Sequence, residues 1–282
     1  MTESGEPAPR VEIARDVAHP ARVYDYVLGG KDNFSADRET AEKAAAAAPG
    51  GLDRARAAAE ANKAFRARAV RYLVVEAGIR QLLEVGTGVP GPENTHQIAQ
   101  RLAPESRVVY VDDDPVVLAN ARKLRTSSPE GAAAYVYGDV RDPERILAQV
   151  PATLDLARPV AVLFVGILNH ITDEEDPYGI VGRLLSAMAP GSHLVVSHVT
   201  GDVMTEEMAD AAKLLNSQPG FALAPRGRDE VSRFFAGLEL VEPGVVLADQ
   251  WRPDEPDNRD EGPPAPAGEW PAPFYGAVGR KP

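Results

Sequence analysis

The residues best suited to chemistry lie in the stretch 82–91, which reads Leu-Leu-Glu-Val-Gly-Thr-Gly-Val-Pro-Gly. Gly86 and Gly88 bracket Thr87 directly after an apolar run, and a glycine, which has no Cβ, lets backbone N–H groups approach a ligand closely. Gly91 completes the pattern G-x-G-x-x-G, which is typical of dinucleotide sites. The stretch predicts a buried strand that runs into a loop for an adenosine-bearing cofactor, and it leaves the identity of that cofactor open.

Carboxylates follow the next two predicted strands. Asp112 ends the second strand, where it can accept hydrogen bonds from the two ribose hydroxyls of a nucleotide, and Asp113 is next in line. Capping of the following helix is an equal alternative for Asp113 and for Asp114. Asp139 follows the third strand and can accept from an adenine amino group, while the backbone N–H groups near Val140 contact a ring nitrogen. A plain loop acid is the alternative for Asp139.

Glu84 lies inside the first predicted strand, where a dinucleotide-binding fold normally has an apolar core residue. A buried carboxylate is costly unless something pairs with it. A cationic aminoacyl end on the ligand, or the N–H groups of the glycine loop, would provide that partner. Glu84 therefore favours a cofactor other than a dinucleotide.

Histidines provide the candidates for proton transfer. His170 and Asn169 follow a strand predicted over 160–168, at a strand end suited to substrate contacts. We predict His170 as a general base or substrate contact, with a hydrogen-bonded structural histidine as the alternative. His198, near the end of the next strand, and Asn169 are predicted as substrate contacts. His19 is expected to carry no chemistry.

The elements that must position these residues alternate along the chain. About 80 residues of helix come first, including helices near 20–28 and 36–48 and a longer one with Phe65 on its apolar face. Strands then follow near 82–86, 107–112, 133–137, 160–168 and 192–199, with helices near 93–102, after Pro115, and near 143–149, 177–188, 203–216 and 228–236. Such alternation implies βαβ units and a doubly wound, mostly parallel sheet.

The C-terminal part ends this alternation. Residues 238–251 and 274–280 are predicted as two strands, and the acidic, proline-rich insert 253–273 between them cannot form a helix. Two strands joined without a crossover helix should be antiparallel neighbours. We therefore expect a reversed last strand.

Three ordered motifs carry a resemblance to a known class. Glu-Val-Gly-Thr-Gly at 84–88, Val-Asp-Asp-Asp-Pro at 111–115 and Gly-Asp-Val at 138–140 resemble those of class I S-adenosylmethionine-dependent methyltransferases. More narrowly, the segment 22–34, the end of the long helix and Pro-Val-Ala-Val-Leu from Pro159 resemble the S-adenosyl methyltransferase family that was formerly a domain of unknown function. The resemblance covers nearly the whole chain from Pro20 onward.

The resemblance implies a Rossmann-like, seven-stranded sheet with an antiparallel last strand, and N-terminal helices that cover the cofactor. It supplies no substrate. The chain departs from the common Glu-x-Gly-x-Gly-x-Gly motif at Pro90, where the family pattern has glycine.

The N-terminal segment has a possible part in the site under this resemblance. Gly30 and Asn33 are predicted to contact the cofactor, with a helix stop and turn as the alternative. Tyr24, Tyr26 and Phe34 either pack in the core or form an aromatic face near the sulfonium, where cation–π attraction contributes roughly 0.5–2 kcal/mol. Tyr26 and Phe34 are the predicted substrate contacts of this segment.

Composition excludes several other functions. The 282 residues carry a formal net charge of −12, which disfavours nucleic acid and anionic membranes. No cysteine is present, so disulfides and thiolate metal sites are excluded, and no run approaches the ~20 apolar residues of a membrane span. The spacing of His, Asp and Glu predicts no metal site, and no Gly-x-Ser-x-Gly elbow indicates a hydrolase. We expect a cytoplasmic protein, and its arginine- and alanine-rich composition suggests a bacterial source.

These predictions combine into one reading. Residues 1–18 are expected to be a disordered tail, 19–80 an N-terminal helical cap, and 81–282 the catalytic core of an α/β fold. The predicted function is methyl transfer from S-adenosylmethionine to an unknown, small-molecule acceptor by in-line displacement. The alternatives are an NAD-dependent oxidoreductase and a non-catalytic S-adenosylmethionine-binding regulator. The acceptor and the oligomeric state cannot be read from the sequence.

Overall fold

The computed structural model describes residues 13–47, 49–91, 93–121, 128–203, 205–253 and 272–282. Residues 1–12 of the expected tail and most of the proline-rich insert therefore lie outside the described residues. The end of the expected tail is held in place, because the Arg22 guanidinium donates hydrogen bonds to the carbonyls of Ala14 and Val17. The expectation of a loose tail is thus wrong for 13–18.

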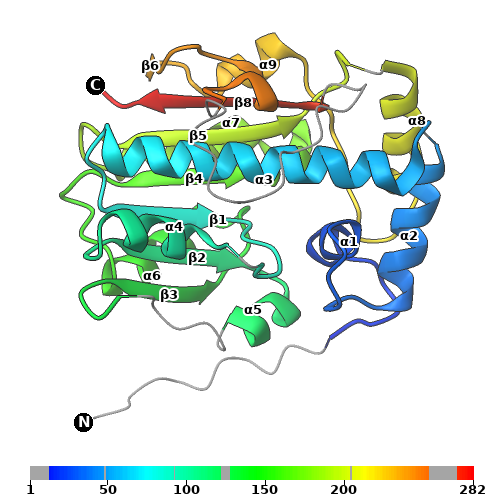
Figure 1. The fold of residues 1–282 in the computed structure, drawn as a ribbon, viewed down its shortest axis with the longest axis horizontal. Helices are drawn as coiled ribbons and strands as arrows, with labels where there is room; N and C mark the ends of the chain where they lie inside the picture. The colour runs from blue at the N-terminus through cyan, green and yellow to red at the C-terminus, as the bar shows by residue number, and fades with distance from the viewer. Residues whose placement is uncertain (1–12, 48, 92, 122–127, 204, 254–271) are drawn as a thin grey trace.

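One mixed sheet organises the described chain (Figure 1). Its parallel strands are β1 Gln81–Val85, β2 Arg107–Asp112, β3 Ala132–Tyr137, β4 Ala161–Val165 and β5 His193–Val199. The strand β8 Phe274–Arg280 runs antiparallel to β5, and the order is β3-β2-β1-β4-β5-β8-β6. The predicted doubly wound sheet with a reversed last strand is confirmed.

The predicted strand over 238–251 is wrong in its length. It forms two short strands, β6 Glu239–Leu240 and β7 Val246–Leu247, which both pair with β8, so the described sheet has eight strands rather than seven. Pro243 lacks an N–H, and Gly244 adopts φ 83°, so a turn interrupts the run. The run ends in a single 3-10 turn, Ala248–Gln250.

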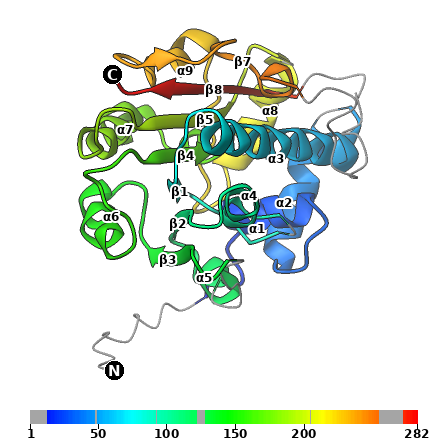
Figure 2. The same ribbon diagram turned by 60° about the vertical axis from the view of Figure 1, so that its left-hand side comes forward.

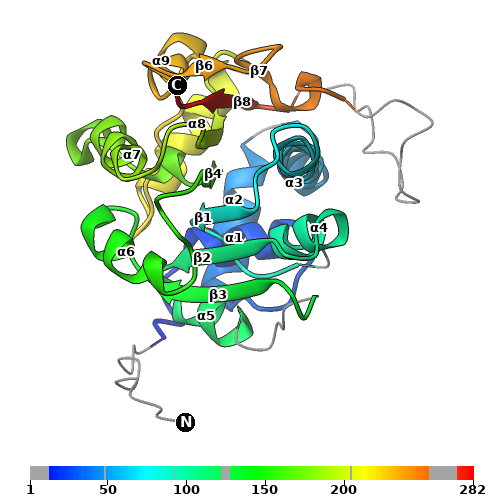
Figure 3. The same ribbon diagram turned by 90° about the vertical axis from the view of Figure 1, so that its left-hand side faces the viewer.

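Helices cover both faces of the sheet (Figure 3). On one face lie α3 Gly51–Val75 and α4 Thr95–Leu102, and on the other lie α6 Pro143–Gln149 and α7 Pro177–Ser186. The remaining helices are α1 Pro20–Val27, α2 Ser35–Ala46, α5 Pro115–Ala121, α8 Thr205–Asn216 and α9 Arg228–Arg233. Two hydrophobic clusters match these faces, one around α3 and one around α6 and α7.

The N-terminal helices do not all share one position. Helices α1 and α2 lie beyond the carboxyl ends of the parallel strands (Figures 1 and 2). Helix α3 instead lies along the sheet and buries Phe65, Ala69 and Leu73 against it, on the face that the sequence predicts. We use the term cap below for α1 and α2 only.

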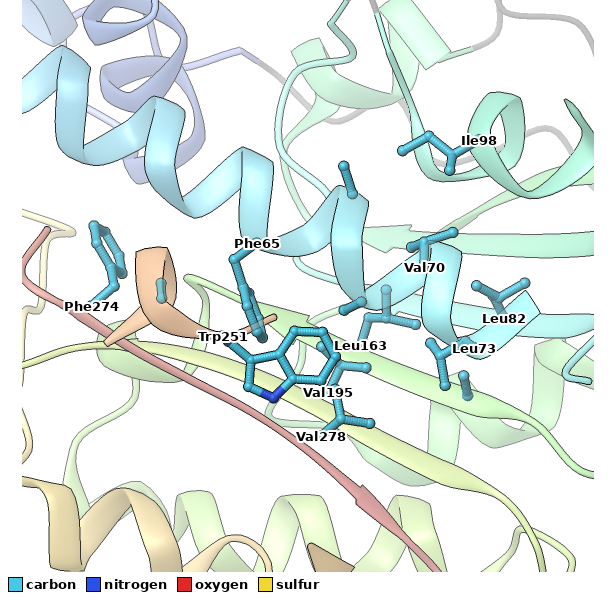
Figure 4. Close-up of a cluster of buried hydrophobic side chains, with 14 of the residues drawn as sticks. Phe65, Val70, Leu73, Leu82, Ile98, Leu163, Val195, Trp251, Phe274 and Val278 are labelled. Carbon is cyan, nitrogen blue, oxygen red and sulfur yellow. The ribbon is translucent and has the colours of Figure 1, made fainter. Parts of the chain in front are cut away.

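A cluster of aromatic rings anchors α3 (Figure 4). Trp251 is fully buried, and its ring meets Phe65 edge-on at 5.5 Å and Tyr72 edge-on at 6.0 Å. The buried Arg68 side chain donates to the carbonyls of Trp251 and Ala248. These contacts fix the long helix relative to the sheet.

The strand β4 is shorter than the predicted 160–168. It ends at Val165 because Gly166 adopts φ 70°, a left-handed conformation that cannot continue a strand. A 3-10 turn, Leu168–His170, follows and carries Asn169 and His170. The chain thus turns where the site begins.

Removing the Trp251 ring should destabilise the fold. We expect Trp251→Ala to lower the free energy of unfolding by about 3–5 kcal/mol, the usual cost of emptying a large buried site. Leu240→Ala, at a side chain that is 45% exposed, should change it by less than about 0.5 kcal/mol. Urea unfolding followed by circular dichroism measures both, and equal values would contradict this account of the core.

Candidate active site

A cavity of about 430 Å³ lies at the carboxyl ends of the parallel strands. Its size falls in the usual range for small-ligand sites, roughly 300–1,000 Å³. The wall is formed by the segment before and within α1, the loops after four strands, and a loop after α8: His19, Pro20, Ala21, Tyr24, Gly86, Thr87, Gly88, Asp112, Asp113, Gly138, Val140, Arg141, Val165, Gly166, Ile167, His170, Ile171, Gly220, Phe221 and Ala222.

The glycine loop shapes one wall. Gly86 and Gly88 have φ of 72° and 69°, which favour glycine. A Cβ at Gly86 would lie 2.4 Å from the Ile167 side chain, whereas one at Gly88 would meet nothing within 4 Å. The loop N–H groups are already bonded, since Gly86 and Thr87 donate to the Val111 carbonyl and Gly88 donates to Asp112. The expectation of free N–H donors there is wrong, and what the loop offers is close approach at Gly88.

Asp112 presents the buried carboxylate of the cavity. Its side chain accepts hydrogen bonds from the backbone N–H of Gly88 at 2.8 Å and of Asp114 at 3.0 Å. Burial raises the pKa of Asp112 to about 6, against the lowering effect of these two bonds. An ionised carboxylate has about four acceptor positions, so capacity for ligand hydroxyls is left.

The two neighbouring acids, Asp113 and Asp114, have different roles. Asp114 is buried, and it caps α5 by accepting from the Val116 N–H at 2.7 Å. Asp113 lines the cavity, and its side chain is 42% exposed. The helix-capping alternative therefore applies to Asp114.

The third strand end contributes Val140 and Arg141 to the cavity wall. The Asp139 side chain does not line the cavity and accepts from the Arg141 backbone N–H at 2.9 Å. The Arg141 guanidinium also contacts Asp139 and Glu175 and donates to the His170 carbonyl. Arg141 was not predicted, because a single arginine in a loop has no spacing signal.

His170 lines the cavity and lies on the 3-10 turn after β4. Its Nδ1 lies 2.7 Å from the Ala222 carbonyl, which can only accept, so Nδ1 carries the hydrogen and Nε2 keeps its lone pair. Burial lowers the pKa of His170 to about 4. The ring is therefore neutral at pH 7 and can accept a hydrogen bond.

A buried ionic cluster attaches the cap to this site. Arg22 Nε lies 3.3 Å from Asp37 Oδ2 and 3.5 Å from Asp114 Oδ2, and all three side chains are buried. His19 Nδ1 lies 3.1 Å from Asp114 Oδ2, and His19 Nε2 lies 3.6 Å from Asp113 Oδ1. Burial lowers the pKa of His19, but the hydrogen bond to Asp113 and the nearby carboxylates outweigh it and raise the pKa overall. His19 thus takes part in the ionic cluster and lines the cavity, which its position in the sequence did not predict.

Glu84 has one charged partner within the protein. It is buried, its Oε1 lies 3.4 Å from Arg66 Nη1, and it does not line the cavity. Arg66 is held in turn by a bond to the Glu93 carbonyl. The other oxygen, Oε2, is buried and has no hydrogen-bond partner among the described residues, so the pairing of Glu84 with a ligand stays a prediction.

Four predicted residues of the N-terminal segment lie outside the cavity wall. Asn33 donates to Asp25, and a Cβ at Gly30 would overlap Asp25, so these two form the turn that was their alternative. Tyr26 donates to Glu42 of α2 at 2.7 Å. The Phe34 ring meets the Arg22 guanidinium at 5.2 Å, so the cation at this aromatic face is a residue of the cap.

His198 is also placed away from the cavity. It is fully buried, its Nδ1 donates to the Val199 carbonyl, and its Nε2 accepts from Arg226 at 2.9 Å. Burial lowers its pKa to about 3. The Arg226 guanidinium also donates to the carbonyls of Leu168 and Ile171, so His198 supports the turn that carries His170. Its predicted substrate contact is not supported.

Two negative findings apply to the described part of the chain. No group of three or more His, Asp and Glu side chains in it could hold a metal ion. None of its helices combines the length and the apolar character that crossing a membrane requires.

Fold and cavity together define a class of protein. A mostly parallel sheet with one reversed strand, and a cavity formed by a glycine loop and a buried carboxylate at neighbouring strand ends, are the features of a Rossmann-like protein with a nucleotide-cofactor site. Gly91 takes no part in strand packing, since it is exposed and its N–H donates to Asn94. The third glycine of a dinucleotide fingerprint should pack helix against strand.

Comparison with known proteins identifies the family. The model of the family described as S-adenosyl methyltransferase matches residues 6–282. A DUF574 family protein from Streptomyces avermitilis shares 41% identity over 96% of this chain and 100% of its own, with a TM-score of 0.89. A Thermobifida fusca protein, provisionally described as a methyltransferase, shares 38% identity over 98% of this chain and 99% of its own, with a TM-score of 0.83. No curated protein matched. The chain belongs to the S-adenosyl methyltransferase family.

The protein is therefore an S-adenosylmethionine-dependent methyltransferase, as the sequence predicts. The NAD-dependent alternative drawn from the three glycines is set aside. The family and its structural relatives leave the methyl acceptor unassigned.

Binding of S-adenosylhomocysteine should depend on the ionisation of Asp112. With a pKa of about 6, this carboxyl is ionised at pH 7 and protonated below pH 6, so affinity should fall about tenfold between pH 7 and pH 5. Asp112→Asn should bind more weakly at pH 7 and show little change over this range. His19→Gln should show the same fall in affinity as the wild type. Isothermal titration calorimetry measures these affinities, and loss of the pH dependence in His19→Gln would contradict the assignment to Asp112.

Breaking the ionic cluster should destabilise the protein. Arg22→Met leaves the buried Asp37 carboxylate without its cation and Asp114 with His19 alone, which should cost about 3–5 kcal/mol in the free energy of unfolding. Arg280→Met removes an exposed partner of Glu239 and should cost less than about 1 kcal/mol. Chemical denaturation measures the two, and a small effect at Arg22 would show that the cap is held by other contacts.

Proposed function

We propose that the cavity at the strand ends holds S-adenosylmethionine and that the enzyme methylates a small molecule. In this proposal Asp112 accepts from the ribose hydroxyls, Gly88 allows the ligand to approach the backbone, and Val140 packs beside the adenine. The observation that carries the proposal is a buried carboxylate beside an unobstructed glycine in one cavity.

The residues present fit this cofactor. At Gly88 the backbone opens on free space, and the Asp112 carboxylate keeps acceptor positions beyond its two backbone bonds. The aromatic rings of Tyr24 and Phe221 lie in the same wall, where they can attract a sulfonium.

When bound, the cofactor supplies a methyl group on a sulfonium sulfur, which keeps the electron pair of the broken bond. The protein contributes positioning. Holding the reacting atoms in line can lower the activation free energy by several kcal/mol. Helix α1 of the cap contributes Pro20, Ala21 and Tyr24 to the wall of the cavity. His170 Nε2 can hold the acceptor group and take the proton that it loses.

We extend the proposal to the setting of the enzyme. A cytoplasmic location is supported by the lack of cysteine. A bacterial source is supported by the two bacterial relatives. The net charge of −12 disfavours a nucleic-acid acceptor.

A transfer screen tests the proposed acceptor class. The enzyme is incubated with methyl-labelled S-adenosylmethionine and either a small-molecule extract or a protein fraction, and the labelled products are separated by size. Label in small products supports the proposal. Label only in protein or nucleic acid would contradict it.

Once an acceptor is found, His170→Ala should lower turnover by about tenfold to a hundredfold, at the low end for a general base because its pKa is low. S-adenosylhomocysteine affinity should stay near the wild-type value. Tyr26→Phe serves as the control and should leave turnover unchanged, because its hydroxyl bonds Glu42. Unchanged turnover in His170→Ala would rule out its role.

A further inference from the structure

A second cavity, of about 240 Å³, adjoins the first. Its wall comes from α1, α2, α3 and α8, the turn after β4, and residues near β8. In contrast to the first cavity it is mainly apolar, with Val23, Val27, Met208, Leu215 and Phe274 among its lining residues.

Small side chains create this space. The wall includes seven alanines, at positions 41, 44, 45, 55, 58, 59 and 211. Helices that meet through alanines leave a hollow between them unless larger side chains fill it. The charged lining residues Arg54 and Glu207 have opposite signs, and His170 is neutral at pH 7, so the wall has no net formal charge.

The two cavities share a wall. Pro20, Tyr24, Gly166, His170 and Phe221 line both of them. A ligand in the second cavity therefore contacts the residues that also face the proposed cofactor. Methyl transfer requires the acceptor atom to touch the methyl carbon, and the shared residues place the two ligands side by side.

Polar groups at this wall point to a hydrogen-bond donor on the ligand. Asn169 is only 2% exposed and lines the second cavity, yet its Oδ1 has no hydrogen-bond partner among the described residues. A buried, unpaired amide oxygen is costly, and a ligand donor would remove that cost. His170 Nε2, one residue further along the same turn, is a second acceptor without a protein partner in the described chain.

From these features we infer that the second cavity is the acceptor site, and that the acceptor is an uncharged, largely apolar small molecule with one hydroxyl group. This inference rests on the proposed function. The apolar body of such a molecule fills the space between the alanine-bearing helices, and its hydroxyl donates to Asn169 or His170. A charged acceptor would lose much of its hydration in this mainly apolar wall, whose two charged residues, Arg54 and Glu207, carry opposite charges that cancel, and that loss is unfavourable.

Naphthol is a suitable probe, because it combines a bicyclic apolar body with one hydroxyl. Its affinity is measured by titration calorimetry in the presence of S-adenosylhomocysteine, beside its methyl ether and naphthalene sulfonate. We expect naphthol to bind about fivefold more tightly than the ether, which lacks the donor, and more tightly than the sulfonate. No saturable naphthol binding, or tighter binding of the sulfonate, would overturn the inference.

Matched variants locate the binding. Ala58→Leu and Ala211→Leu fill the cavity and should weaken naphthol by about tenfold or more. Ala57→Leu and Ala209→Leu lie on the same helices outside its wall and should have little effect. Asn169→Leu should remove the preference for naphthol over the ether. Equal naphthol affinity in the filled and control variants would contradict the site.

Affinity for S-adenosylhomocysteine, measured in every variant, separates the two proposals. Retained affinity shows that a variant is folded and that the first cavity is intact. If the wild type binds naphthol as expected but no S-adenosylhomocysteine, the cofactor assignment fails and the chemistry of the second cavity stands. If it binds S-adenosylhomocysteine but no naphthol, the reverse holds.

Discussion

The buried ion pairs of Arg22 are the contact on which the rest of the site depends. Arg22 bridges Asp37 of the cap and Asp114 of the loop after β2, in surroundings nearly closed to water. Charges buried in this way are unstable apart, because each loses its hydration without a replacement. The cap and the strand end must therefore stay together, although they lie about 90 residues apart in sequence.

A short chain of hydrogen bonds links that contact to the cofactor site. The N–H of Asp114 donates to Asp112, whose other oxygen accepts from Gly88. Thus the loop that binds the cap also orients the carboxylate proposed for the ribose. The same helix α1 supplies Pro20 and Tyr24 to both cavities. One structural element thereby forms part of the wall of the cofactor cavity and part of its boundary with the inferred acceptor site.

The sequence was sufficient for the fold and for the loops at the strand ends, because both depend on local patterns. Alternating apolar runs and helical periods predict the parallel sheet. Gly88 and Asp112 lie in the cavity because ligands of such sheets bind beyond the carboxyl ends of the strands. The predictions that failed depended on contacts between residues that are distant in sequence. A ligand contact was a reasonable prediction for His198, but Arg226, distant in sequence, pairs with it instead, and Arg66 likewise pairs with one oxygen of Glu84.

Other residues were missed for the same reason. Nothing in the spacing of Arg22 or His19 shows that they meet Asp114, and no local pattern distinguishes Arg141 from a surface arginine. The alanines of the second cavity look like ordinary helix formers, and only the packing of four helices shows the space between them. One local signal was present in the sequence. Pro243 and Gly244 form a turn that divides the strand predicted from apolar content alone.

The central claim is that the cavity beside Gly88 holds the cofactor. Its most direct test is calorimetric titration of S-adenosylhomocysteine into the wild type and Gly88→Asn, since asparagine tolerates the left-handed backbone while adding a side chain where Gly88 opens on free space. The account predicts saturable binding to the wild type and a large loss of affinity in the variant, with the circular dichroism spectrum unchanged. Equal affinity in both proteins would place the cofactor elsewhere and contradict the account.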